Sequence, residues 1–123
     1  MMVKIDTREK FHVITVHEAI LAANMTEKMD KVIMPLLDDN VKNVVFNMKD
    51  IKMVESAAAD RLVKLHDHFH AGNASFVLCE LQPDVRRSLE ESNTLVKLNY
   101  TPTESEAIDM VQMEEIEREF GEP

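Results

Sequence analysis

The sequence is poor in the residues from which several common kinds of site are built. Cys79 is the only cysteine, so an intrachain disulfide is impossible. The chain has two glycines and neither a glycine-rich phosphate loop nor a G-x-G-x-x-G pattern, which argues against a nucleotide cradle. Cysteine and histidine do not occur at zinc-type spacing. We therefore expect no cofactor and no metal.

Long apolar runs and positive charge are also scarce. No run of 18 apolar residues occurs, so we expect no membrane-spanning helix. The 14 basic and 23 acidic residues give a formal net charge of -9. Nucleic acids and anionic membranes both require a cationic surface, so we expect neither as a partner. The start of the sequence lacks the pattern of a secretion signal, and we expect a soluble cytoplasmic protein.

Hydrophobic residues nevertheless make up 45% of the 123 residues, enough for a packed core. The length favours one domain over residues 1–123. Apolar and β-branched stretches predict strands, whereas 18–24 is interpreted as a loop. The run at 43–48 is apolar throughout, which is typical of a central parallel strand buried on both faces. The predicted strands are 2–7, 11–17, 43–48, 75–81 and 95–99.

Helices are predicted between these strands from caps and helical spacing. Asn24 with Glu27 forms a capping box before a helix that Pro35 ends. A second helix spans about 57–71, with apolar Leu62, Leu65 and Phe69, and stops at Gly72; a third begins at Pro83. Thr103 and Glu106 cap a fourth. Its acidic end, about 113–123, is interpreted as a solvated helix.

Strands that alternate with helices predict an α/β fold in which the sheet is mostly parallel. We expect a mixed sheet of four to five strands, with about four helices packed largely on one face. Ligands and partners of such folds bind at loops that follow the carboxyl ends of the strands. The stretch 53–57 is such a loop. We expect the ends of the strands near 17–21 and 48–56 to form one exposed patch that includes Ala57 and Ala58.

Ser56 stands directly before a helical run and has two compatible interpretations. A serine there is typical of an N-cap, whose oxygen accepts a backbone N–H. A helix N-terminus also tolerates a phosphate, because its free N–H groups and the positive end of the dipole attract anions. The three alanines that follow leave the backbone accessible to a partner.

Other reactive side chains support catalysis less well. Glu55 is adjacent to Ser56, which is a poor position for a base that activates a nucleophile. His66 and His70 share one helix face at metal-binding spacing, but without a further ligand cluster they are interpreted as part of a solvated face near the helix C-terminus. Cys79 lies inside an apolar strand and is interpreted as a small buried hydrophobe.

The stretch around Ser56 resembles the STAS domain, the fold of bacterial anti-sigma-factor antagonists. The family pattern is an apolar pair, then D-S-S-G, then a helix with a leucine. Here the corresponding residues are Met53-Val54, Glu55-Ser56-Ala57-Ala58 and Leu62. "LCELQPDVRRSLEESN" and "TPTESEAIDMV" extend the resemblance over about residues 3–112, and Glu106 and Ala107 fit the start of the family's closing helix.

The resemblance implies a protein-binding domain without an active site of its own. The partner would be an anti-sigma factor that is itself a serine kinase; phosphorylation would end the interaction and a phosphatase would restore it. Ser56 falls on the phosphorylated serine of the family. Asn47 falls where the family has an acidic or amide residue, and Glu18 to Leu21 form the earlier docking loop. The implied partner-binding residues are Glu18, Leu21, Asn47, Glu55, Ser56, Ala57 and Ala58.

Several of these positions depart from the family pattern, and three functions stay open. Glu55 replaces the aspartate, Ala57 the second serine, Ala58 the glycine, and Leu21 the aspartate of the earlier loop. A Cβ at position 58 narrows the approach to the backbone. The first hypothesis is a phosphoregulated antagonist, and the second is a constitutive binding or scaffold module. The third is a small α/β enzyme or phosphocarrier that uses His66, His70 or Cys79.

Overall fold

The main sheet is built on an antiparallel hairpin, which three further strands extend in parallel. The structure is a computed structural model that describes residues 1–121. Strand β1 (Val3–Thr7) pairs antiparallel with β2 (Phe11–Val16), and β4 (Asn43–Asn47), β6 (Phe76–Cys79) and β7 (Asn99–Thr101) follow in parallel. The spatial order is β1-β2-β4-β6-β7. The predicted mixed, mostly parallel sheet is therefore confirmed.

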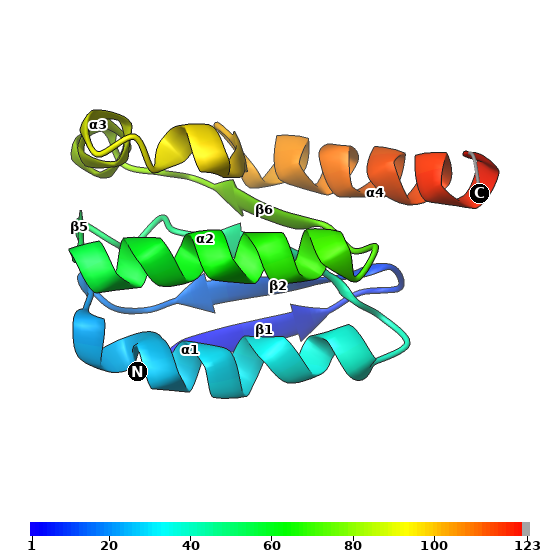
Figure 1. Cartoon of the computed structure of the whole chain (residues 1–123), viewed down its shortest axis with the longest axis horizontal. Coiled ribbons are helices and arrows are strands. Elements are labelled where there is room, and N and C mark those ends of the chain that lie inside the picture. Colours follow the sequence, from blue (N-terminus) through cyan, green and yellow to red (C-terminus); the bar gives the residue numbers. More distant parts are fainter. Residues whose placement is uncertain (122–123) are drawn as a thin grey trace.

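Three helices cover one face of this sheet, and the fourth covers the other face. Figure 1 shows α2 in front of the sheet and α4 along its upper edge. The larger apolar cluster contains side chains from α1, α2 and α3, whereas Ala107 and Val111 of α4 belong to a second cluster with Val45 and Val77. The bounds are α1 Thr26–Ile33, α2 Ser56–Ala71, α3 Pro83–Glu91 and α4 Glu104–Phe120.

The alternation of side chains along β4 explains why this strand lies in the middle. Val44 and Phe46 enter the larger cluster, whereas Val45 enters the smaller one, and all three are fully buried. A strand flanked by apolar layers on both faces has no solvated side, as its continuous apolar sequence predicted.

A second, minimal sheet lies beside the first, and the sequence did not predict it. It pairs β3 (Ile20–Leu21) with β5 (Met53–Val54) in parallel, Ile20 opposite Met53 and Leu21 opposite Val54. The region 18–24, predicted as a loop, therefore contains a short strand. It also contains the first of three 3-10 turns, which are Ala23–Met25, Met34–Asp38 and Leu95–Lys97.

Two local predictions are wrong. The strand expected at 95–99 is a 3-10 turn followed by β7, because the chain must first leave α3 and descend to the sheet edge. Asn24 does not cap α1: the position before this helix is Met25, which makes no side-chain cap bond. The Glu55 carboxylate instead accepts the Ala23 N–H at 2.7 Å, so this turn receives its acceptor from another segment.

The end of α4 differs in part from the expected solvated helix. Thr103 caps the helix as predicted, accepting the Glu106 N–H at 3.2 Å. Glu114 and Glu115, however, are only partly exposed, because their carboxylates face Ser75 and Asn43. Residues 122–123 of the predicted acidic end lie outside the described residues. Among residues 1–121, no helix is long and apolar enough to cross a membrane.

Candidate functional site

The loops that follow β2 and β4 are joined by the β3–β5 pair. Ala19 accepts the Lys52 N–H at 2.7 Å, and Leu21 accepts the Glu55 N–H at 2.9 Å. The Glu55 carboxylate bonds the Ala23 N–H as a third link. The two segments are more than thirty residues apart in the chain, yet main-chain bonds hold them side by side at the carboxyl edge of the sheet.

This junction exposes two large apolar side chains next to Ser56. Ile20 is 42% exposed and Met53 is 48% exposed, and they are register partners. We call the exposed group Ile20, Met53, Glu55, Ser56 and Ala57 the β3–β5 patch. Both residues lie in stretches that the sequence predicted to form an exposed patch, but neither was singled out as a contact residue. The available signal was an apolar residue without periodic neighbours in each loop, which indicates an exposed side chain as readily as a buried one.

Ser56 is exposed and is the first residue of α2, which corrects the prediction that it is the N-cap. The N-cap position is Glu55, with extended backbone (φ -75°, ψ 153°), and the Glu55 main-chain oxygen accepts the Ala59 N–H at 2.9 Å. Glu55 makes no side-chain cap bond, since its carboxylate turns to Ala23. The first turn of a helix has N–H groups without acceptors in the helix itself, and Ser56 lies among them.

A hydroxyl-lined cavity of about 240 Å³ lies beside Ser56, between α2 and α3. Ser88, Ser92 and Thr94 contribute hydroxyls, and the side chains of Ser92 and Thr94 bond each other at 2.8 Å. Asp60, one helical turn after Ser56, is the charged residue of the lining. The cavity beside Ser56 is therefore largely polar and contains one acidic side chain.

Three predicted contact residues are buried and do not form part of an exposed surface. Ala58 and Leu21 have no exposed area, and Asn47 is 4% exposed. The expectation that Ala58 lies in the patch is wrong, because it stands four residues before Leu62 and faces the core on the same helical stripe. Its Cβ therefore points away from solvent and does not obstruct the approach to the backbone.

Asn47 and Glu18 form hydrogen bonds that stabilise this edge of the sheet. The Asn47 amide donates to the Glu104 carboxylate at 2.9 Å, and its oxygen accepts the Lys49 N–H at 2.9 Å. Asn47 thereby links the end of β4 to the start of α4. Glu18 is half-buried and accepts the Met2 N–H at 2.6 Å, which holds the start of the chain against this loop.

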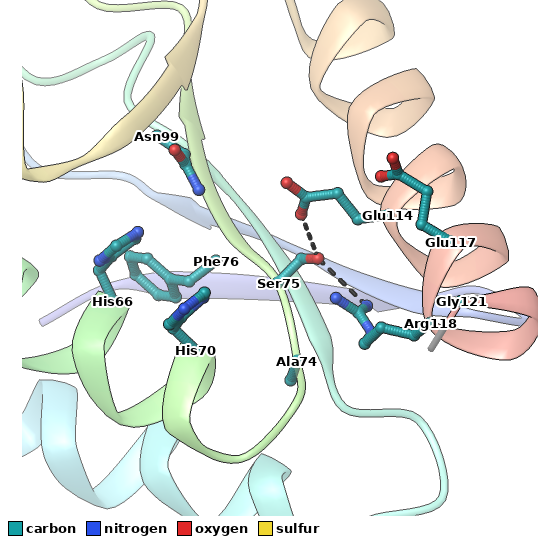
Figure 2. Close-up of a pocket in the computed structure, with 10 residues that line it drawn as sticks. All are labelled: His66, His70, Ala74, Ser75, Phe76, Asn99, Glu114, Glu117, Arg118 and Gly121. Atoms are coloured by element: carbon teal, nitrogen blue, oxygen red, sulfur yellow. Dashed lines mark hydrogen bonds between the residues drawn. The ribbon is translucent and has the colours of Figure 1, made fainter. Parts of the chain in front are cut away.

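A second cavity, lined by titratable side chains, lies at the opposite end of α2. A cavity of about 340 Å³ has His66 and His70 on one wall, with Glu114, Glu117 and Arg118 on the other (Figure 2). The two imidazole rings are stacked, with centroids 6.3 Å apart. The Ser75 hydroxyl, between the walls, donates to Glu114 and accepts from Arg118 at 3.2 Å.

Cys79 is not part of this cavity. It ends β6, whereas the cavity lies at the start of that strand, so the structure does not bring together the three residues of the enzyme hypothesis. Burial, with smaller contributions from Glu104 and Glu80, raises the pKa of the Cys79 thiol to about 12. Such a thiol is a poor nucleophile at neutral pH. Over residues 1–121, no three metal-ligating side chains come close enough to form a site.

Solved structures with this architecture include anti-sigma factor antagonists. One from Mycobacterium paratuberculosis is 14% identical and has a TM-score of 0.77, over 90% of this chain and 93% of that one. SpoIIAA in its unphosphorylated form is 18% identical with a TM-score of 0.72, over 90% and 96%. The phosphorylated form from Bacillus is 18% identical with a TM-score of 0.66, over 89% and 99%. At these identities the likeness establishes the fold.

The family follows from the sequence itself. The family model of the STAS domain matches residues 2–107, which is most of the chain. The protein therefore belongs to the STAS domain family. No curated protein sequence matches it.

Proposed function

We propose that this protein is a cytoplasmic regulator of the anti-sigma-factor-antagonist type. It binds an anti-sigma factor that is a serine kinase, and phosphorylation of Ser56 ends the interaction. The observation that carries the proposal is the exposed Ser56 hydroxyl at the first position of α2, next to the exposed Ile20–Met53 pair. Family membership supports it, because the named structural relatives are antagonists.

The apolar pair accounts for binding in the unmodified state. Ile20 and Met53 offer apolar contact area, and Ala57 leaves room for a partner backbone beside them. The main-chain links between the loops fix this surface before the partner arrives, so little ordering cost falls on binding. Exposed apolar side chains clustered at a loop edge are typical of interaction sites.

The charges around Ser56 account for release. A phosphate adds about -1.5 to -2 charges at neutral pH. The N-terminus of α2 tolerates it within the free protein, so the fold survives. In a closed interface, however, the phosphate would stand beside Glu55 and Asp60, and desolvating this group of like charges is costly. Phosphorylation therefore opposes the complex much more than it opposes the fold.

A constitutive binding module is the second candidate, and the contacts of Glu55 favour it. Glu55 places a carboxyl group at the patch whether or not Ser56 is modified. This group accepts the Ala23 N–H and does not bond Ser56. The patch is complete without modification. In this case Ser56 contributes only to the shape of the surface.

Binding by the wild type and by Ser56→Ala and Ser56→Asp variants decides between the two candidates. The titrant is a purified anti-sigma kinase from the same cell, with phosphorylation followed by intact mass. Ser56→Ala should bind and stay unmodified, whereas Ser56→Asp should bind at least tenfold more weakly, or ~1.4 kcal/mol. Ser105→Asp is the matched control, because Ser105 is exposed in the first turn of α4. Equal binding by all variants, with no phosphate on Ser56, would leave the constitutive module.

A further inference from the structure

Helix α4 has a second apolar face that the domain does not cover. Its inner face carries the buried Ala107 and Val111 against the sheet. On the outer side, Met113 is 64%, Ile116 is 54% and Phe120 is 82% exposed. Their spacing of three and four residues places them on one helix face. We call these three residues the α4 stripe. Figure 1 shows the C-terminal half of α4 with the sheet on one side only.

A row of this kind differs from the scattered apolar residues of an ordinary surface. Three large side chains lie within about two helical turns, and α4 needs none of them for its contact with the sheet. Next to Ile116, a recess of about 280 Å³ is bounded by Lys10 of the β1–β2 turn, Gln112, Glu115 and Glu119. A partner side chain could enter this recess while its neighbours contact Met113 and Phe120.

The charges around the α4 stripe are almost all negative. At helical spacing from the stripe lie the exposed Glu106 and Asp109 on the same outer side, and the exposed Glu117, which also borders the cavity of His66 and His70. Two basic residues lie close by, and both are engaged: Arg118 with Asn43, Ser75 and Glu115, and Lys10 with Glu119 at 3.9 Å. The acidic residues of α4 are Glu104, Glu106, Asp109, Glu114, Glu115, Glu117 and Glu119.

We propose that the α4 stripe docks a helical segment of another protein whose apolar face is flanked by lysine or arginine. An amphipathic helix matches a row of anchors at this spacing, and cations on its flanks would face Glu106, Asp109 and Glu117. A second copy of this chain fits poorly, because two α4 helices face to face would oppose acid to acid in a protein of net charge -9.

This surface is independent of the β3–β5 patch. The stripe lies toward the C-terminal end of α4, whereas Ser56 begins α2 at the carboxyl edge of the sheet, at the other end of the molecule in Figure 1. The protein can therefore contact two partners at once. Failure of the function proposed for Ser56 would leave this inference untouched.

The test measures binding of a fluorescent amphipathic peptide of leucine and lysine, about 18 residues long so that it can form a helix. Its matched control carries glutamate in place of lysine. The protein variants are Met113→Ser/Ile116→Ser/Phe120→Ser for the stripe and Glu106→Gln/Asp109→Asn/Glu117→Gln for the acids. Met2→Ser/Val96→Ser controls for other exposed apolar residues, and Glu9→Gln/Asp38→Asn/Glu91→Gln controls for other exposed acids.

We expect the lysine peptide to bind the wild type, and each of the two α4 variants to bind at least tenfold more weakly, or ~1.4 kcal/mol. The two control variants should stay within about twofold of the wild type, and the glutamate peptide should not bind. Equal binding by the stripe variant and the wild type overturns the proposal. So does sedimentation of the wild type as a dimer that the stripe variant converts to a monomer, because the occupant would then be a second copy. Thermal melting should be unchanged, since all three side chains are exposed.

Discussion

The two ends of α2 have opposite characters. At its N-terminus, Ser56 and Ala57 are exposed and small, and main-chain bonds hold the neighbouring loops. Near its C-terminus, His66 and His70 face a cavity in which the Ser75 hydroxyl bonds both Glu114 and Arg118. The C-terminal end has the greater number of reactive side chains, whereas the phosphorylation site that we propose lies at the N-terminal end.

The difference shows that an abundance of polar side chains is a weak guide to function when many of them bond one another to hold the fold together. Asn43 accepts from the Ser75 N–H and from Arg118, both at 2.9 Å, and donates to the Lys10 main-chain oxygen at 3.0 Å. This network attaches the end of α4 to the starts of β4 and β6. The hydrogen bonds near the C-terminal end of α2 thus stabilise the fold, whereas the side chains at its N-terminal end are available for contact with a partner.

Replacing Asn43 by alanine should give the largest loss of stability. The side chain is 2% exposed, and its removal leaves the N–H of the buried Ser75 without its partner and breaks the bond to the Lys10 main-chain oxygen. We expect the free energy of unfolding, measured by urea denaturation, to fall by about 3 kcal/mol. Asn40→Ala, at an exposed position, should change it by less than about 0.5 kcal/mol. If the two substitutions lowered the unfolding free energy equally, the Asn43 network would not stabilise the fold, and its polar groups would be available to a ligand.

Leucine substitutions at the adjacent Ala57 and Ala58 should show which of the two residues belongs to the core and which to the surface. Ala58 is fully buried, so Ala58→Leu overpacks the core and should cost about 2 kcal/mol of unfolding free energy. Ala57→Leu, at an exposed position, should cost less than about 0.5 kcal/mol and should act on partner binding instead. If both variants lose stability equally, Ala57 also belongs to the core and the β3–β5 patch is smaller than described.

The smallest effect should come from Cys79, and only in alkali. Its thiol pKa is raised from 9.0 to about 12 in the fold, so the unfolded chain loses its proton first. Stability from this group is complete below pH 9 and declines as the pH rises from 9 toward 12. At pH 10 the wild type should have lost about 1.4 kcal/mol relative to its value at pH 7 through this group. Cys79→Ala should lack this part of the alkaline decline; parallel curves for the two proteins would contradict the burial of the thiol.

Most of the fold could be predicted because its strongest signals are periodic. The run through Val44, Val45 and Phe46 indicated a central strand, and Leu62, Leu65 and Phe69 gave the buried stripe of α2. The β3–β5 pair was missed because two residues per strand produce no period. Asn24 was misassigned because the acceptor for the Ala23 N–H comes from Glu55, a partner that local sequence does not reveal.

The candidate site was predicted less well than the fold, for reasons of the same kind. The position of Ser56 followed from the pattern around it, but whether each neighbour points inward depends on its helical phase. Extending the stripe of Leu62 back by four residues would have placed Ala58 in the core. The role of Asn43 could not be predicted, because its partners Ser75 and Arg118 are 32 and 75 residues away in the chain.

At the β3–β5 junction, the shape of the carboxyl edge of the sheet depends little on which side chains the edge carries. Three of its links, to Ala19, Leu21 and Ala23, use main-chain groups on at least one side. Every residue provides a main-chain oxygen, and every residue except proline an N–H. Exposed positions such as Ile20, Met53 and Ala57 can therefore change while the platform keeps its form. This freedom is consistent with loops that diverge from the family pattern on a preserved fold. It also makes the edge a scaffold on which new recognition surfaces could be selected by varying only outward-facing residues.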